Sequence, residues 1–223
     1  MGYLTKEMAV KAISSMSGFH HEIVAAYAKY DMDLLDNLGR RNIVMSQAQE
    51  KFFSSSLANT YSGVINDGRT GQPDIVIGSL HKELECKLTS KQKSGSISFQ
   101  TDYETLLQKE ELDYLYVVAD KDFKSFAVLH FEGLTTNDFR SPSPGSRGKV
   151  AMIKHKAMGK CNVLMGDVIN RNDIEISKIQ KKLSTISERA VATKKKLEKS
   201  LEYWNNTPTK YSISLEEVSL CAA

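Results

Sequence analysis

The sequence has 223 residues, of which 41% are hydrophobic and 26% are charged, and its 30 Lys and Arg against 27 Asp and Glu give a formal net charge of +3. This length supports one domain with an extension or two small domains, and the small net charge excludes a polycationic chain, so any surface for an acidic partner must come from local clustering. Three scattered cysteines exclude a disulfide scaffold. The chain has no apolar run of ~18 residues and no signal-peptide pattern, so we expect no membrane partner and a cytoplasmic location.

The N-terminal third is predicted to be mostly helical. In residues 5–38 apolar side chains recur every three or four positions, and Ser17-Gly18 is expected to interrupt this helix. A second helix is predicted over residues 46–61, where Ser46 begins a Ser-x-x-Gln capping box. A short strand over residues 62–65 and a turn-rich loop follow.

Residues 73–88 predict a β-hairpin around which the remaining chain is organised. The run that begins at Asp74 is rich in β-branched residues, Gly78-Ser79 breaks it, and the second half alternates polar and apolar residues. Because successive strand residues point to opposite faces, Glu85 and Lys87 share one face. With Asp74 at the start of the paired strand, two carboxylates and an ammonium are expected to converge beside an apolar sheet.

This arrangement has a chemical use. The carboxylates of Asp74 and Glu85 and the backbone carbonyl of Cys86 are hard oxygen ligands that suit Mg²⁺. Mg²⁺ at such a site can polarise a phosphodiester and lower the pKa of a bound water. Lys87 could orient that water or offset charge on the phosphate. The alternative is a surface hairpin with a solvated Glu–Lys pair that contributes little.

Pro73-Asp74, a short gap, and then Glu85-Cys86-Lys87 resemble the signature of the PD-(D/E)XK nucleases. This superfamily includes many type II restriction endonucleases and several repair or recombination nucleases. The resemblance implies that Asp74 and Glu85 bind the metal and that Lys87 positions or activates the water. It further implies that Glu50, on the preceding helix, helps to complete the metal site and that Gln100 lies beside it; a solvated helix-surface Glu50 is the alternative.

The segments after the hairpin predict the rest of the core. Residues 99–109 are predicted to be a helix, and residues 112–119 and 123–131 are predicted strands. Helix, strand, hairpin, helix and strand in this order predict an α/β fold with a mixed β-sheet flanked by helices. It is also the order of the restriction-endonuclease-like core, which the resemblance implies.

Polar and basic residues near the hairpin and over residues 133–160 are the candidate DNA contacts. Residues 133–149 are predicted to be a long loop, and such loops in compact domains tend to be functional. Arg can read guanine bidentately, and Ser can hydrogen-bond bases or phosphates. A solvated loop without a role is the alternative. The candidates are Arg69, Thr70, Lys91, Lys93, Arg140, Ser141, Ser143, Ser146, Arg147, Lys149, Lys154, His155 and Lys156.

Residues 173–205 predict a long C-terminal amphipathic helix or helix pair with a coiled-coil-like stripe and a basic opposite face. The stripe would serve dimerisation or packing on the core with the basic face near DNA, although a charged face is often only solvated. A last strand is predicted over residues 211–218. The expected organisation is a nuclease core over 1–172 and a helical extension over 173–223. The stripe residues are Ile176, Ile179, Leu183, Ile186, Ala190, Leu197, Leu201 and Trp204.

The residues and the resemblance together lead to one expected function. We expect a Mg²⁺-dependent, sequence-specific endonuclease that cleaves double-stranded DNA to 5′-phosphate and 3′-hydroxyl ends, as a type II restriction enzyme of a prokaryotic cell does. A symmetric site implies a homodimer, and self-protection implies a cognate DNA methyltransferase. The alternatives are a structure-specific repair or recombination nuclease and a non-catalytic DNA-binding module.

Overall fold

The computed structural model describes residues 2–69, 71–91, 96–143, 148–166 and 171–206, and of residues 171–181 the backbone alone. The backbone contacts divide the chain into two units, residues 1–171 and residues 172–223. The first unit contains the sheet and the helices that cover it. The second unit contains most of one long helix.

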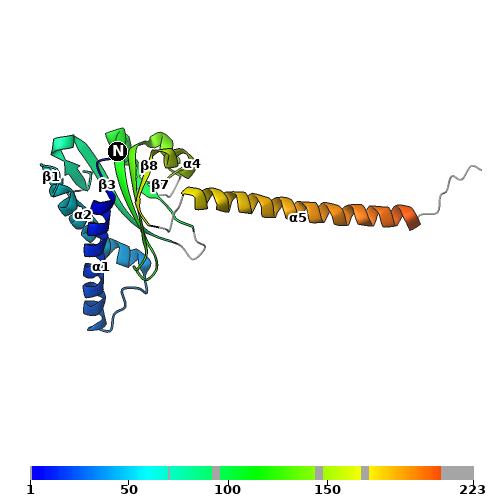
Figure 1. Cartoon of the computed structure of the whole chain (residues 1–223), viewed down its shortest axis with the longest axis horizontal. Helices are drawn as coiled ribbons and strands as arrows, with labels where there is room; N and C mark the ends of the chain where they lie inside the picture. Colours follow the sequence, from blue (N-terminus) through cyan, green and yellow to red (C-terminus); the bar gives the residue numbers. More distant parts are fainter. Residues whose placement is uncertain (1, 70, 92–95, 144–147, 167–170, 207–223) are drawn as a thin grey trace, which may run out of the picture. The chain divides into compact units, whose positions relative to one another are not determined.

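A mixed sheet forms the centre of the first unit, as predicted, and it has six strands (Figure 1). Its strand order is β1-β2-β3-β5-β6-β8; β3 and β5 are parallel and the other neighbours are antiparallel. The apolar run of β5 places it in the middle of the sheet, where both faces are covered. The strands are β1 (Val64–Asn66), β2 (Ile75–Ile77), β3 (Lys82–Ser90), β5 (Glu111–Ala119), β6 (Phe126–Thr135) and β8 (Cys161–Met165).

Two long helices, α1 (Lys6–Ala28) and α2 (Leu38–Ala58), lie side by side on one face of the sheet (Figure 1). Their buried residues and the inward side chains of β2, β3, β5 and β6 form the main hydrophobic core. The predicted interruption at Ser17-Gly18 is wrong, because α1 runs through it; a single helical glycine costs only about 1 kcal/mol. The predicted capping box at Ser46 is also wrong. Asn37 caps α2, and Ser46 lies inside the helix and bonds to the carbonyl of Ile43.

The opposite face of the sheet is covered by a small two-stranded sheet, β4 (Gln100–Asp102) with β7 (Lys149–Ala151), and by aromatic side chains. The ring centroids of Phe99 and Tyr116 are 4.9 Å apart. The predicted helix over residues 99–109 therefore begins too early. Asp102 ends β4 and caps the shorter helix α3 (Tyr103–Lys109), because its carboxylate accepts two amide hydrogens of the first turn.

The predicted long loop over residues 133–149 is shorter than predicted. Its first residues complete β6 and a 3₁₀ turn, η2 (Thr136–Asp138), and Phe139 then pairs with Met152 in an isolated bridge. Phe139 and Met152 are both buried, so apolar residues among the turn-formers tie this segment to the core. The other short elements are η1 (Gly78–Leu80), α4 (Lys154–Ala157) and η3 (Met158–Lys160).

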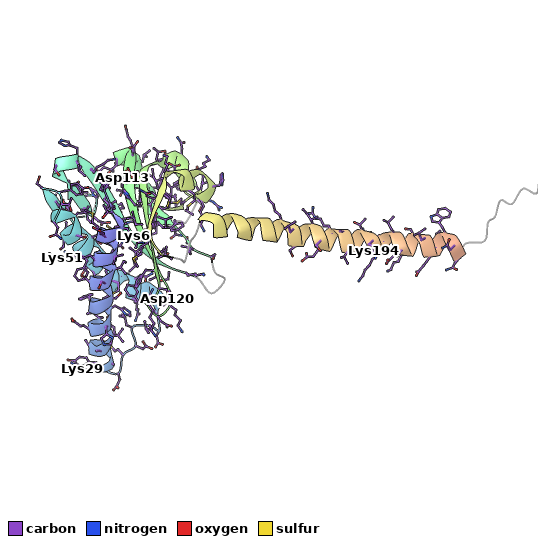
Figure 2. The ribbon with its side chains drawn as sticks, viewed as in Figure 1. Lys6, Lys29, Lys51, Asp113, Asp120 and Lys194 are labelled. Carbon is purple, nitrogen blue, oxygen red and sulfur yellow. The ribbon has the colours of Figure 1, made fainter. Side chains whose placement is uncertain are left out.

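The C-terminal segment is one continuous helix, α5 (Arg171–Asn206), and not a helix pair. Its side chains from residue 182 onward, Lys194 among them, project away from the helix and are exposed (Figure 2). None of the helices in the described ranges combines the length and the hydropathy that crossing a bilayer requires. The strand predicted over residues 211–218 lies outside the described residues.

Candidate active site

The β2–β3 hairpin brings Asp74 next to the Glu85-Cys86-Lys87 segment, as the sequence predicts. Ile75 of β2 pairs with Leu84 of β3, so Asp74 lies one position further along, facing Glu85. The amide of Cys86 donates to Oδ2 of Asp74 at 2.7 Å. This hydrogen bond fixes one carboxylate of the candidate site to the strand that carries the other.

Glu85 and Lys87 project from the same face of β3 and form a hydrogen-bonded ion pair. Glu85 is only 7% exposed, and the Lys87 ammonium donates to its Oε1. The other oxygen, Oε2, is buried and has no hydrogen-bond partner in the described part of the chain. Because a buried carboxylate oxygen without a donor is costly, it requires an explanation, and a bound cation is one.

Helix α2 carries Glu50 to the same end of the sheet. Its neighbour Gln49 is buried, and the Gln49 side-chain amide donates to the Leu115 carbonyl of β5 at 3.0 Å and approaches the Lys87 carbonyl at 3.5 Å. The Ser-x-x-Gln pattern predicts a capping role for Gln49 and does not reveal this contact. The sequence feature that indicates such a contact is a polar residue within the apolar stripe of α2, flanked by Ala48 and Phe53.

The three carboxyl groups affect one another electrostatically. Burial, followed by the Glu85 carboxylate, raises the pKa of Asp74 from 3.8 to about 7, although the Lys87 ammonium works in the opposite direction. Burial also raises the pKa of Glu50. Burial opposes the charged form of Lys87, yet the neighbouring carboxylates outweigh it and raise the pKa of the ammonium. The site therefore concentrates negative charge that lacks sufficient compensation from the protein.

This site fits a divalent cation by the chemistry of its donors. Within the described ranges, no three His, Cys, Asp or Glu side chains gather closely enough to form a metal site by themselves. Mg²⁺, however, commonly uses one or two carboxylates and takes its remaining ligands from water and substrate phosphate. Asp74 and Glu85 would be the side-chain ligands, with the carbonyl of Cys86 as the predicted third. The orphaned Oε2 of Glu85 and the raised pKa of Asp74 are both relieved by a cation there.

Gln100 lies near Lys87, although not on a helix as predicted. It occupies the first position of β4 and lines a cavity of about 240 Å³ together with Lys87, Thr89 and Lys149. The other polar residues of its lining are Ser98, Thr101, Asp102 and Tyr116. The face of β3 that presents Lys87 is thus continuous with a polar hollow between the two sheets.

The candidate DNA contacts fall into three groups. Arg69 is exposed but forms an ion pair with Asp67 at 2.5 Å. Lys154 donates to the Ile97 carbonyl and lies over the Phe99 ring, so it is engaged by the segment that leads into β4. Thr70, Lys93, Ser146 and Arg147 lie outside the described residues. The exposed candidates are Lys91, Arg140, Ser141, Ser143, Lys149, His155 and Lys156.

No family model and no curated protein match this chain. Any functional inference therefore rests on the geometry of the hairpin and the cavity beside it. It consists of two acidic side chains and a lysine beside an open polar cavity, an arrangement suited to hydrolysis of a phosphate ester with metal assistance.

Proposed function

We propose that the protein is a Mg²⁺-dependent endonuclease that cleaves double-stranded DNA at specific sequences, in the manner of a type II restriction enzyme of the PD-(D/E)XK superfamily. The observation that carries the proposal is the buried Glu85 carboxylate. One of its oxygens is held by Lys87, the other has no donor in the described residues, and Asp74 faces it across the hairpin. The residue types at these positions match the superfamily signature.

The side chains would act as follows. Asp74 and Glu85 would hold the cation, and Glu50 would add negative charge nearby. Lys87 lies beside the ligand carboxylate and orients the water that attacks phosphorus. When bound, Mg²⁺ supplies Lewis-acid polarisation of the phosphate and neutralises charge on the leaving oxygen. The products would carry 5′-phosphate and 3′-hydroxyl ends.

The specificity and the partners belong to the same proposal. The exposed basic and hydroxyl residues around β7, including Arg140 and Lys149, would contact the duplex. A symmetric recognition sequence would be bound by a homodimer, and a methyltransferase would protect host DNA. The sheet order and the hairpin support the restriction-endonuclease-like form of the α/β fold.

Digestion of plasmid and phage DNA tests this proposal. The purified full chain with MgCl₂ is expected to give discrete fragments, and EDTA or the Asp74→Ala variant is expected to abolish them. A smear or nicking alone would instead favour a nuclease that recognises DNA structure. DNA binding without any cleavage, in the wild type and in Asp74→Ala alike, would favour a non-catalytic DNA-binding module.

A further inference from the structure

The described part of α5 exposes apolar side chains along one side. Leu183, Ile186, Leu197 and Trp204 are between 59% and 72% exposed. Together with three small residues they alternate in steps of three and four, which are the a and d positions of a heptad repeat. We call this row the apolar seam. Strict alternation places Ser200 at the d position, and Leu201 of the predicted stripe lies beside it at e. The seam members are Leu183, Ile186, Ala190, Thr193, Leu197, Ser200 and Trp204.

The charged residues that flank the apolar seam all have the same sign. In this heptad the e and g positions adjoin the seam, and their charged members are Lys182, Arg189, Lys194 and Lys196. The carboxylates of this segment lie at b and f positions on the other side; they are Glu188, Glu198 and Glu202. Lys194 lies 3.8 Å from Glu198, but both side chains are exposed, and such pairs contribute little.

A second copy of this helix would be a poor occupant of the seam. A parallel pair places Arg189 at g opposite Lys194 at e of the other helix, and an antiparallel pair places g against g and e against e. Neither arrangement brings a carboxylate to a flank. Because like charges across a coiled-coil seam are repulsive, the charge pattern disfavours self-pairing.

A bilayer surface is a poor occupant as well. A helix that lies on a membrane inserts a broad apolar face. Here Ala190, Thr193 and Ser200 leave three of the seam positions with small or polar side chains, and the large exposed side chains beside the seam, Leu201 and Tyr203, gather at its C-terminal end. Small residues at a seam suit the close approach of another helix, and they provide little area for insertion into lipid.

We propose that α5 binds a helix of a different protein, one whose own apolar a and d residues are flanked by Glu or Asp at e and g. Apolar packing would supply the contact, and complementary charge at the flanks would select this partner over a second copy. This inference does not depend on nuclease activity.

Isothermal titration of the full chain with synthetic heptad peptides tests the proposal. The probe has Ile at a, Leu at d and Glu at e and g, and the matched control peptide has Lys at e and g. We expect micromolar binding of the Glu peptide, roughly tenfold weaker when NaCl rises from about 0.05 M to about 0.5 M, and no binding of the Lys peptide.

Two sets of charge-reversal variants distinguish a role of the flanking residues from a role of residues on the far side of the helix. Reversal of the four flanking charges (Lys182→Glu, Arg189→Glu, Lys194→Glu and Lys196→Glu) should switch the preference to the Lys peptide. Reversal of Lys195 and Lys199, which lie at f and c positions, should leave binding of the Glu peptide unchanged. The double variant Leu183→Asp/Leu197→Asp, which places charges in the apolar seam, should abolish all peptide binding.

Three results would overturn the proposal. The first is binding of the Glu peptide that the flank reversal does not alter. The second is self-association of the wild-type chain in sedimentation equilibrium that the Leu183→Asp/Leu197→Asp variant loses, because a second copy would then occupy the seam. The third is binding to phosphatidylserine vesicles without binding to the Glu peptide.

Discussion

Two lysines form ion pairs with carboxylates of β3. One of them is Lys87, whose partner Glu85 projects from the same face of the strand. Lys109 of α3 contacts Glu83 at 2.9 Å, two positions before Glu85. The two pairs have the same chemistry but different positions. Glu85 lies opposite Asp74 and Lys87 lines the cavity, whereas neither Glu83 nor Lys109 does so. They therefore offer a matched test of whether position beside the candidate metal ligands matters.

We expect Lys87→Ala to lower the rate of Mg²⁺-dependent DNA cleavage roughly 10³-fold, because the variant loses the group that orients the attacking water. Lys109→Ala should retain nearly the wild-type rate. Single-turnover cleavage of plasmid DNA by the two variants measures the difference, and binding in Ca²⁺ checks that Lys87→Ala still engages DNA. Equal losses in both variants would show that the Glu85–Lys87 pair has no special role.

Asp74 makes the stability of the metal-free protein depend on pH. Its pKa is about 7 when folded against 3.8 ordinarily, so between these values the folded protein holds a proton that the unfolded chain has lost. Unfolding then releases a proton, and stability falls as pH rises through this window. Above this pH window the folded protein remains destabilised by the full amount, because the buried Asp74 carboxylate is then charged beside Glu85.

Asp74→Asn removes this penalty and can keep the hydrogen bond from the Cys86 amide. We expect the metal-free variant to be more stable than wild type by roughly 2 kcal/mol at pH 8 and similar to it at pH 4. Urea unfolding at both pH values gives the comparison. Mg²⁺ should stabilise wild type at pH 8 and should have little effect on the variant, whereas a constant difference across pH would contradict the assignment.

At the scale of elements, α2 is joined to the sheet by buried polar side chains as well as by apolar packing. Arg41 is fully buried; its guanidinium donates to the carbonyls of Asp120 and Lys121 and to the Ser90 hydroxyl. It also lies 5.0 Å from the centroid of the Phe123 ring. One side chain therefore links the first turns of α2 to the end of β3 and to the β5–β6 turn.

Arg41→Leu should destabilise the protein by roughly 3 kcal/mol, because the carbonyls of Asp120 and Lys121 lose their charged donor. Arg40, the preceding residue, is exposed, and Arg40→Ala should change the free energy of unfolding by less than about 0.5 kcal/mol. Urea denaturation followed by circular dichroism measures both. A small effect of Arg41→Leu would mean that these carbonyls find other donors.

The sequence predicts the strands of the large sheet better than it predicts the boundaries of the helices and loops around them. The alternation in β3 and the apolar run in β5 are strong local signals, and both strands lie where predicted. The start of α2 and the β4–β7 pairing are set by contacts distant in sequence. A capping motif at Ser46 and turn-formers before Lys149 could not reveal them, because tertiary contacts override local preference.

The same distinction between local and tertiary contacts applies to the candidate site. The proximity of Asp74, Glu85 and Lys87 can be predicted because a short hairpin with two-residue periodicity fixes their faces locally. The contact of Gln49 and the cavity beside Gln100 cannot, because their positions depend on how α2 and the small sheet pack on β3 and β5. Short-range geometry can be predicted from pattern alone, and the packing of whole layers cannot.

At the scale of the whole molecule, the core and the long helix are separate units. The members of the main core cluster come from residues up to Met165, and from residue 182 to Asn206 each side chain of α5 is exposed. A compact unit that contains its own hydrophobic core can fold independently. The core should therefore fold without α5.

We expect a chain truncated after Arg171 to unfold cooperatively with a melting temperature within about 3 °C of the full chain, because it keeps the main core cluster and the charge network around Glu85. It should also keep Mg²⁺-dependent cleavage of DNA at high enzyme concentration. Thermal denaturation and plasmid digestion of both chains make the comparison. If the truncated chain folds but cleaves nothing while the full chain cuts, α5 supplies part of the DNA-binding surface, and the charge pattern of its flanks would then have to be explained by DNA phosphates instead of an acidic helix.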